Sequence, residues 1–151
     1  MKYIFKKETR VTTVTDVEVD LVNIVVKPTY LHYKFSGGYD YWVRIVPIFV
    51  VDYSTPEQRV TNDIKGWNVY IVKDEKITRT GIDLNRITIT TDNDNVIRDV
   101  KYNPIGITNN VPTEVIFYLL TGKRYDDCFF SHTTKEIFDI KVFYFLDITI
   151  Q

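Results

Sequence analysis

The stretch Tyr30–Ser54, YLHYKFSGGYDYWVRIVPIFVVDYS, is nearly all aromatic or β-branched and has one break, at Ser36-Gly37-Gly38. Glycine tolerates the positive φ angles that two-residue hairpin turns require. The stretch therefore predicts two antiparallel strands joined by a turn at Gly37-Gly38. In the register of such a turn, Tyr33 lies opposite Trp42, and both side chains share one face of the hairpin.

Two apolar segments suggest strands with more than one buried face. Residues 42–51 are an almost unbroken apolar run, which is typical of a strand buried on both faces. Pro47 lacks a backbone N–H, so it predicts a bulge or a sheet edge at that point. Residues 138–150 alternate regularly, which predicts a long strand with one fully apolar face and with Phe143 and Phe145 on the other.

The composition predicts a mainly β fold. Of the 151 residues, 77 are Val, Ile, Thr, Tyr, Phe or Trp, which favour strands, whereas alanine, the best helix former, is absent. No linker-like or low-complexity segment divides the chain, and its length is typical of one domain. We therefore expect a single β-rich domain over residues 1–151, an antiparallel β-sandwich or open barrel with one to three short helices.

Local signals place further elements along the chain. Residues 16–21 alternate acidic and apolar side chains, as a half-buried strand would. Ser54-Thr55-Pro56-Glu57 combines hydroxyl caps, a proline and an acid, and predicts a helix of about two turns. Residues 67–80 predict a second hairpin, which turns at 73–76, and residues 86–91 predict another alternating strand.

For two segments the sequence does not decide between helix and strand. Residues 95–102 place three apolar side chains on one helical face and end before Asn103-Pro104. Residues 112–120 begin with a proline and end before Thr121-Gly122, which frames a helix around residues that favour strands.

The chain offers few groups for nucleophilic catalysis. Only His32 and His132 could act as imidazole bases, and the single cysteine, Cys128, is separated from His132 by Phe129-Phe130-Ser131. The expected roles are a packed His32, a loop His132 and a small buried thiol. No glycine-rich phosphate loop or nucleophile elbow occurs, so we predict no catalytic residues, no enzymatic activity and no cofactor.

The turn at residues 91–95, TDNDN, begins like a calcium-binding loop. Its later ligand positions fail, because Val96, Ile97 and Asn103 stand where a calcium loop needs an acid or amide, a glycine and a glutamate. Asp92 and Asp94 therefore predict a turn whose side chains bond to its own backbone. We assign no metal ligands, although the sequence does not decide whether an ion binds at this turn.

Charge and hydropathy limit the possible partners. Nineteen basic residues oppose twenty acidic ones, so no basic excess indicates specific nucleic-acid binding. No apolar run approaches the roughly 18 residues of a membrane-spanning helix. The N-terminal MKYIFKKETR becomes charged too early for a signal peptide, and a lone cysteine forms no internal disulfide. We therefore expect synthesis in a reducing, intracellular compartment.

The aromatic residues point to protein–protein contacts. The chain holds 11 Tyr, 9 Phe and 2 Trp, and a lone sandwich offers only one inner face per sheet. Apolar side chains on both faces of two strands therefore predict cover by an added element or a second chain, in a homo-oligomer or larger assembly. The candidate contact residues are Tyr30, Tyr33, Tyr41, Trp42, Phe143 and Phe145.

The leading hypothesis for function is a non-enzymatic structural component of a virus particle, a tailed phage, located in the virion. Residues with AT-rich codons (Phe, Tyr, Met, Ile, Asn, Lys) number 60, against 18 Gly, Ala, Arg and Pro, which indicates an AT-rich genome. One alternative is a small intracellular inhibitor or immunity-type binding protein. A second is a carbohydrate-binding β-sandwich, in which exposed Trp and Tyr rings would stack on sugars.

Overall fold

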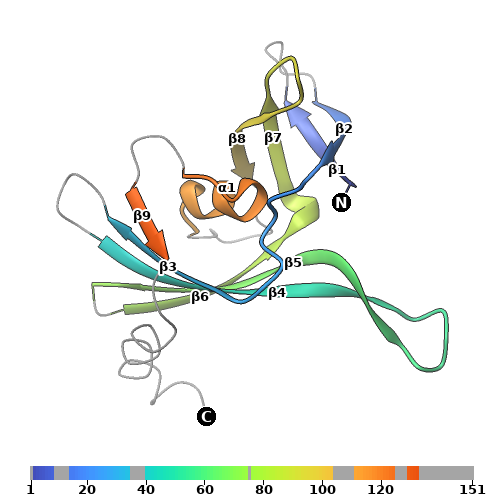
Figure 1. Ribbon diagram of the computed structural model, residues 1–151, viewed down its shortest axis with the longest axis horizontal. Helices are drawn as coiled ribbons and strands as arrows, with labels where there is room; N and C mark the ends of the chain where they lie inside the picture. Colours follow the sequence, from blue (N-terminus) through green and yellow to red (C-terminus); the bar gives the residue numbers. More distant parts are fainter. Residues whose placement is uncertain are drawn as a thin grey trace.

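The computed structural model describes residues 2–8, 14–34, 40–74, 76–103, 111–124 and, by their backbone, 129–132. Its strands form a five-stranded sheet in the order β6-β5-β4-β3-β9 and a four-stranded sheet in the order β2-β1-β7-β8 (Figure 1). The elements are β1 (Lys2–Glu8), β2 (Val14–Asp20), β3 (Thr29–Lys34), β4 (Asp40–Asp52), β5 (Arg59–Lys73), β6 (Lys76–Asp83), the 3-10 turn η1 (Leu84–Arg86), β7 (Ile87–Thr91), β8 (Ile97–Tyr102), α1 (Thr113–Thr121) and β9 (Phe129–His132).

The predicted fold class is confirmed. The described strands pair antiparallel except β1 with β7, which are parallel. One hydrophobic cluster contains side chains from both sheets and from α1, as in a sandwich-like domain. The described strands do not close into a barrel, so the sandwich is the better of the two predicted architectures.

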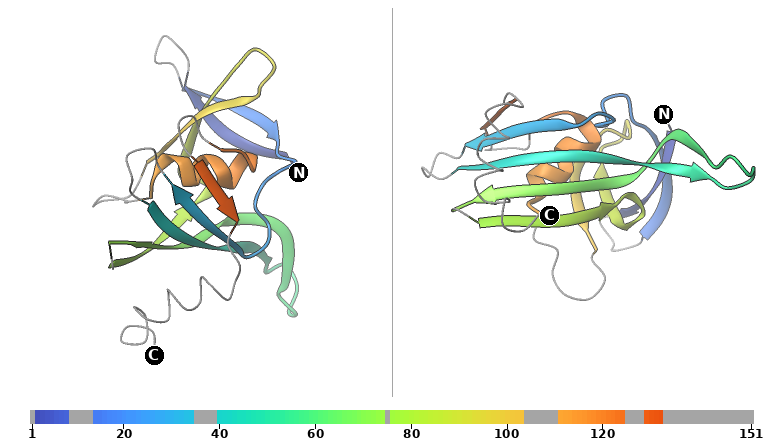
Figure 2. Two further views of the ribbon diagram at one scale, coloured as in Figure 1. Left: turned by 60° about the vertical axis from the view of Figure 1, so that its left-hand side comes forward. Right: turned by 90° about the horizontal axis from the view of Figure 1, so that it is seen from below.

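Helix α1 lies at the centre of this core. It begins after Pro112 and ends at Gly122, whose φ of 66° is the left-handed conformation that closes many helices. Residues 115–120 are six consecutive buried positions, so the helix meets protein on all sides. Figures 1 and 2 show it on one face of the five-stranded sheet and beside β8. Of the two segments that the sequence leaves open, 112–120 is therefore the helix, whereas 95–102 contains strand β8.

The first hairpin forms from β3 and β4, but in a register that differs by one residue from the predicted one. Tyr33 lies opposite Tyr41 rather than Trp42. Because strand side chains alternate between faces, this shift puts Tyr33 and Trp42 on opposite faces, so the predicted shared face is wrong. The predicted turn at Gly37-Gly38 belongs to residues 35–39, which lie outside the described residues.

The burial of β4 alternates along its first half. Tyr41, Val43 and Ile45 are buried against the core, whereas Trp42 and Arg44 on the outer face are half-buried. Within the described residues the outer face of this strand is therefore only partly covered, and its cover by an added element or a second chain stays a prediction. A continuous apolar run identifies a strand but does not show how completely each face is covered.

Pro47 is confirmed as an edge residue beside a bulge. β3 pairs with β4 only as far as Ile45, so at Pro47 the described partner of β4 is β5 alone. The β4–β5 register then shifts between Ile48 and Phe49 and again before Val51. Such shifts bend a hairpin, and beyond them β4 and β5 project from the sheet as a two-stranded ribbon (Figure 1). We call residues 46–65 the β4–β5 arm.

The arm ends in the loop 53–58, where the sequence predicts a helix. That prediction is wrong. The Asp52 carboxylate accepts the Ser54 N–H (2.9 Å), and the Gln58 N–H donates to the Thr55 carbonyl (3.2 Å) with a φ of 49° at Gln58. These contacts reverse the chain at once into β5, so the hydroxyl residues and the proline serve a turn rather than a helix.

The other predicted strands are found close to their expected places. The second hairpin is β5–β6, with Lys73 paired to Lys76, and the strand predicted at 86–91 is β7. The acidic–apolar segment lies in β2, which pairs with β1. Strand β1 is not evident from the sequence because its lysines interrupt the apolar pattern; Lys6 binds Asp16 of β2 at 2.6 Å.

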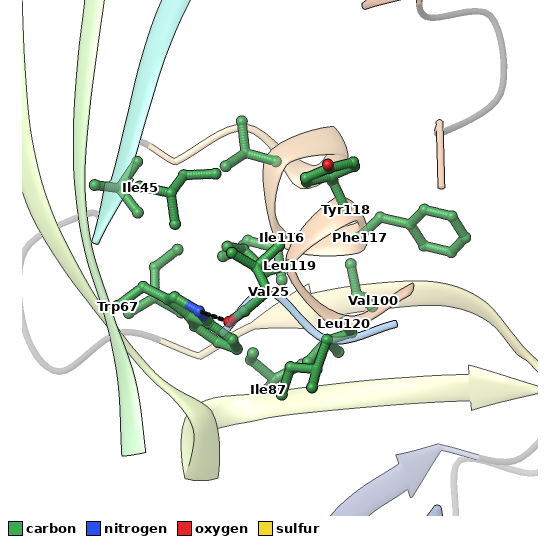
Figure 3. Packing of buried hydrophobic residues seen from close by; sticks show 14 of the residues in the cluster. Val25, Ile45, Trp67, Ile87, Val100, Ile116, Phe117, Tyr118, Leu119 and Leu120 are labelled. Carbon is green, nitrogen blue, oxygen red and sulfur yellow. Dashed lines mark hydrogen bonds between the residues drawn. The ribbon is translucent and has the colours of Figure 1, made fainter. Parts of the chain in front are cut away.

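The connection between the two sheets, residues 21–28, crosses the core, and the backbone of Val25 forms two hydrogen bonds there. The Trp67 indole N–H donates to the Val25 carbonyl (2.9 Å; Figure 3), and the Val25 N–H donates to the Leu119 carbonyl (3.0 Å). Leu119 is in the last turn of α1, where carbonyls have no partner within the helix. One residue of the connection therefore links β5 to the end of α1.

Replacing Trp67 by Phe should lower the free energy of unfolding by roughly 2 kcal/mol or more, because the buried Val25 carbonyl loses its donor and a cavity remains. Denaturant unfolding followed by circular dichroism measures the change. Trp42→Phe is the matched control on the half-buried outer face and should cost less. Equal losses for the two variants would show that the hydrogen bond to Val25 adds little to the free energy of unfolding.

Two tyrosine hydroxyls of the four-stranded sheet accept hydrogen bonds from the backbone of the five-stranded sheet near its bend. The Ile64 N–H donates to Tyr3 Oη (3.0 Å), and the Asp83 N–H donates to Tyr102 Oη (2.9 Å). Each bond satisfies a backbone donor at the place where the sheet changes direction. The bend is therefore built jointly by both sheets.

Gly66 marks the same bend and generates a prediction. A Cβ at Gly66 would overlap the carbonyl oxygen of Ile82, whereas a Cβ at Gly81 would meet nothing within 4 Å. Gly66→Ala should therefore destabilise the protein by about 1–3 kcal/mol, the usual cost of overpacking. Gly81→Ala should be neutral or slightly stabilising. Melting curves of the two variants provide the comparison, and similar curves would contradict the close approach at Gly66.

Candidate interaction surface

The outer face of the five-stranded sheet, turned away from α1, carries two rows of side chains that run across four strands. The cross-strand pairs follow from the registers of β3, β4, β5 and β6. The first row is His32, Trp42, Val72 and Ile77. The second row is Tyr30, Arg44, Tyr70 and Arg79. We call these eight residues the outer-face rows.

The first row packs its aromatic rings together. The His32 ring stacks on Trp42, with centroids 4.0 Å apart and planes 10° from parallel. His32 Nε2 also donates to Asp40 Oδ2 at 2.6 Å. His32 is thus a packed histidine, as predicted. A sugar ring could not stack on the indole face that His32 covers, which removes one platform for the carbohydrate-binding alternative.

The second row holds an arginine between two tyrosines. The Arg44 guanidinium carbon lies 6.0 Å from the ring centroid of Tyr30 and 5.5 Å from that of Tyr70, within the range of cation–π attraction. Its Nε is buried and has no hydrogen-bond partner among the described residues. Arginine and tyrosine are residue types that dominate binding energy at interfaces.

The candidate contact residues fall into three groups. Tyr30 and Trp42 lie in the outer-face rows and pack with Val72. Tyr33 and Tyr41 lie instead in the core, 0% and 2% exposed, so the described fold itself covers them. Phe143 and Phe145, with the rest of the strand predicted at 138–150, lie outside the described residues.

The two buried tyrosines position the start of α1. Their rings stack at 5.0 Å, Tyr41 Oη donates to the Glu114 carboxylate at 2.6 Å, and Tyr33 Oη donates to the Glu114 carbonyl at 3.4 Å. Glu114 is in the first helical turn, where a negative charge also favours the helix dipole. The observed register makes this arrangement possible by turning both tyrosines inward.

The β4–β5 arm exposes apolar side chains that the sequence analysis did not single out. Val50 is 39%, Tyr53 72% and Val60 68% exposed. Residues 49–52 of the arm pair only with residues 59–64 among the described strands. An isolated two-stranded ribbon is marginally stable in water, so an arm of this kind gains from a partner that covers it.

The turn at 91–95 bonds to its own backbone, as predicted. Asp92 Oδ1 accepts the N–H groups of Asp94 (2.9 Å) and Val96 (3.0 Å), and Oδ2 accepts Arg98 Nη2 at 2.7 Å. The bond from Val96, followed by that from Arg98, lowers the pKa of Asp92 below 3.8. Both carboxylate oxygens therefore already have donors.

The lowered pKa of Asp92 gives the turn a pH dependence. The carboxylate stabilises the folded turn at pH values above about 3.8, its unfolded pKa, and this contribution is lost as the pH falls through the lower folded pKa. The difference in melting temperature between the protein and Asp92→Asn should thus be present at pH 7 and shrink below pH ~3.8. A constant difference from pH 7 to pH 2 would contradict this role.

Other candidate groups are placed only in part. His132 lies in strand β9 opposite Leu31, so the loop position predicted for it is wrong, while Cys128 lies outside the described residues. Within the described ranges, no group of three or more His, Cys, Asp and Glu side chains could hold a metal ion. In the same part of the chain, no helix is long and apolar enough to cross a membrane. Comparisons with protein-family models, curated proteins and solved structures gave no match.

Proposed function

We propose that this protein is a non-enzymatic structural component of a protein assembly, the particle of a tailed phage, and that it acts through protein–protein contacts. The observation that carries the proposal is the β4–β5 arm, which extends beyond the core and exposes Val50, Tyr53 and Val60. Burying such side chains stabilises an interface by about 25 cal/mol per Å² of apolar area.

The geometry of the arm favours side-chain docking over simple strand addition. Pro47 and the bulge beyond it interrupt the edge of β4, and both features are devices that discourage edge-to-edge strand pairing. Tyr53 at the tip is an amphipathic ring of the kind that anchors interfaces. The arm therefore inserts its tip into a neighbouring subunit rather than extending the neighbour's sheet.

The phage assignment rests on composition together with this architecture. The bias towards residues with AT-rich codons indicates an AT-rich genome. A β-rich domain with a projecting arm suits repeated contacts in a ring or shell, where each subunit reaches its neighbour. In this setting the copies assemble through the arm, and no chemical step is required.

Light scattering of the purified protein should give a mass above the 17.8 kDa monomer at micromolar concentration. The double variant Tyr53→Ser, Val60→Ser should shift the mass to 17.8 kDa without changing the melting curve, because both side chains are exposed in the single chain. The matched control is Ile4→Ser, Val14→Ser, which removes two other exposed apolar side chains and should leave the mass unchanged.

A strictly monomeric protein at high concentration would contradict self-assembly through the arm. An oligomer that survives the arm variant would place the contact elsewhere. Mass spectrometry of purified phage particles from the source tests the second part of the proposal, which requires the protein at a fixed ratio to the main particle proteins.

A small inhibitor or immunity-type protein is the alternative, and the charge of the arm favours it. The arm carries Asp52, Glu57 and Asp63 in addition to Tyr53, and its basic side chains are Arg59 and Lys65. An acidic–aromatic tip of this kind would suit the basic cleft of a target enzyme. Monomeric behaviour, combined with tight binding to one enzyme that Tyr53→Ser abolishes, would establish this function instead.

A further inference from the structure

The outer-face rows contain a hydrophobic cluster that is separate from the main core. Val72 is 5% exposed and packs with Tyr30, Trp42 and Ile77, which are half-buried. Helix α1 and the four-stranded sheet both lie on the other face of the five-stranded sheet, and no described element lies over the rows (Figures 1 and 2). Soluble proteins rarely leave a contiguous apolar surface of this kind to water, so the rows call for a covering element.

Arg44 requires a hydrogen-bond acceptor on the same face. Its buried Nε has no partner among the described residues. The rings of Tyr30 and Tyr70 flank the guanidinium at 6.0 and 5.5 Å, but a ring face does not replace a carbonyl or hydroxyl oxygen as the acceptor of an N–H. A buried donor without an acceptor destabilises a fold. The element that covers the rows should therefore be apolar and should carry an acceptor.

The chain itself reaches the edge of this face at β9. The last residue of β9, His132, lies opposite Leu31, which is adjacent to Tyr30 of the second row. Residues 133–151 follow it. Neighbouring strands are about 4.8 Å apart, so the five-stranded sheet is roughly 20 Å wide. Residues 138–150 span roughly 40 Å when extended, at about 3.3 Å for each residue, and are long enough to cover the rows.

The sequence of residues 138–150 matches what the outer face requires. In the extended conformation that its alternation predicts, every even-numbered side chain from Phe138 to Ile150 lies on one side, and all of them are aliphatic or aromatic. The one hydroxyl on that side belongs to Tyr144, and its oxygen is an acceptor of the kind that Arg44 Nε needs. The opposite side carries charged residues near both ends and suits contact with water.

We propose that residues 138–150 cover the outer face of the five-stranded sheet of their own chain, with the apolar side against the outer-face rows. The outward side of the segment stays in water, which satisfies its backbone groups. The packing turns Phe143 and Phe145 outward, so these two rings form the aromatic surface that this part of the molecule offers to other proteins. The inference concerns the sheet and does not depend on assembly through the arm.

The same segment of a second copy is the competing occupant. Exchange of identical elements between copies is a common route to dimers. β9 holds its own segment at the edge of the same sheet, however, so docking within one chain is intramolecular. The effective concentration of a tethered segment reaches the millimolar range, which a separate chain at micromolar concentration does not match.

The test attaches a nitroxide spin label to the outward side of the segment, at Lys141→Cys, in the full chain with Cys128→Ser so that one thiol reacts. In ¹H–¹⁵N NMR spectra the label should broaden the amide signals of residues 70–72 and 77–79, because they lie under the segment. A label at Ser54→Cys on the tip of the arm is the matched control and should leave those signals sharp.

A mixed sample separates the two occupants. Spin-labelled chain without ¹⁵N is combined with ¹⁵N-labelled chain without the spin label, and the row signals should then stay sharp. Both chains carry the arm variant Tyr53→Ser, Val60→Ser, which removes assembly through the arm from the measurement. A failure of the assembly proposal therefore leaves this result intact.

Substitutions in the segment test which side packs on the sheet. Val142→Ser should shift the indole N–H signal of Trp42, whereas Phe143→Ser, a larger change on the outward side, should not. The indole signal of Trp67, buried in the main core, is the internal reference and should stay in place in both variants.

Three results would overturn the inference. The first is sharp signals at residues 70–72 and 77–79 in the chain labelled at Lys141→Cys. The second is broadening of the same signals in the mixed sample, which would make a second copy the occupant. The third is an equal shift of the Trp42 indole signal in Val142→Ser and Phe143→Ser.

Discussion

The fold depends on burying α1 on all sides, and the two hydrogen bonds at Val25 make this possible. A helix surrounded by protein cannot leave its last carbonyls to water, so the Leu119 carbonyl takes the Val25 N–H. The connection that supplies this donor must then satisfy its own carbonyl, and Trp67 does so from β5. These bonds hold the connection between the sheets against both the helix and the large sheet, and the surrounding apolar side chains then pack into a single cluster.

Covering α1 also determines which surfaces remain for other molecules. The inner face of the five-stranded sheet and the four-stranded sheet both pack in the shared core, so strands that extend past the core have nothing to cover them. β4 and β5 pass this limit at Pro47, where β3 no longer accompanies them, and become the arm. The arm thus begins where the shared core ends.

A one-residue difference in the β3–β4 register determines which aromatic side chains face the core and which lie in the outer-face rows. The observed pairing turns Tyr33 and Tyr41 inward, where they bond to Glu114 at the start of α1. The same pairing turns Trp42 and Arg44 outward, next to His32 and Tyr30. Of the four contact candidates among the described residues, two therefore support the core and two lie on the outer face. Aromatic content alone could not separate these roles, since rings serve cores and interfaces equally well.

The amino-acid sequence by itself determined the mainly β class, the approximate positions of most strands, the edge at Pro47 and the self-bonded turn at Asp92. Each of these follows from local alternation or from the chemistry of a single residue, which a linear pattern records. Tertiary structure decided the β3–β4 register, the helical state of residues 112–120, and the loop that replaces the helix expected after Ser54. It also decided the exposure of Tyr53 and Val60, which depends on where the neighbouring strand β3 ends. These outcomes depend on contacts between segments far apart in the chain, and such contacts leave no periodic signal in either segment alone.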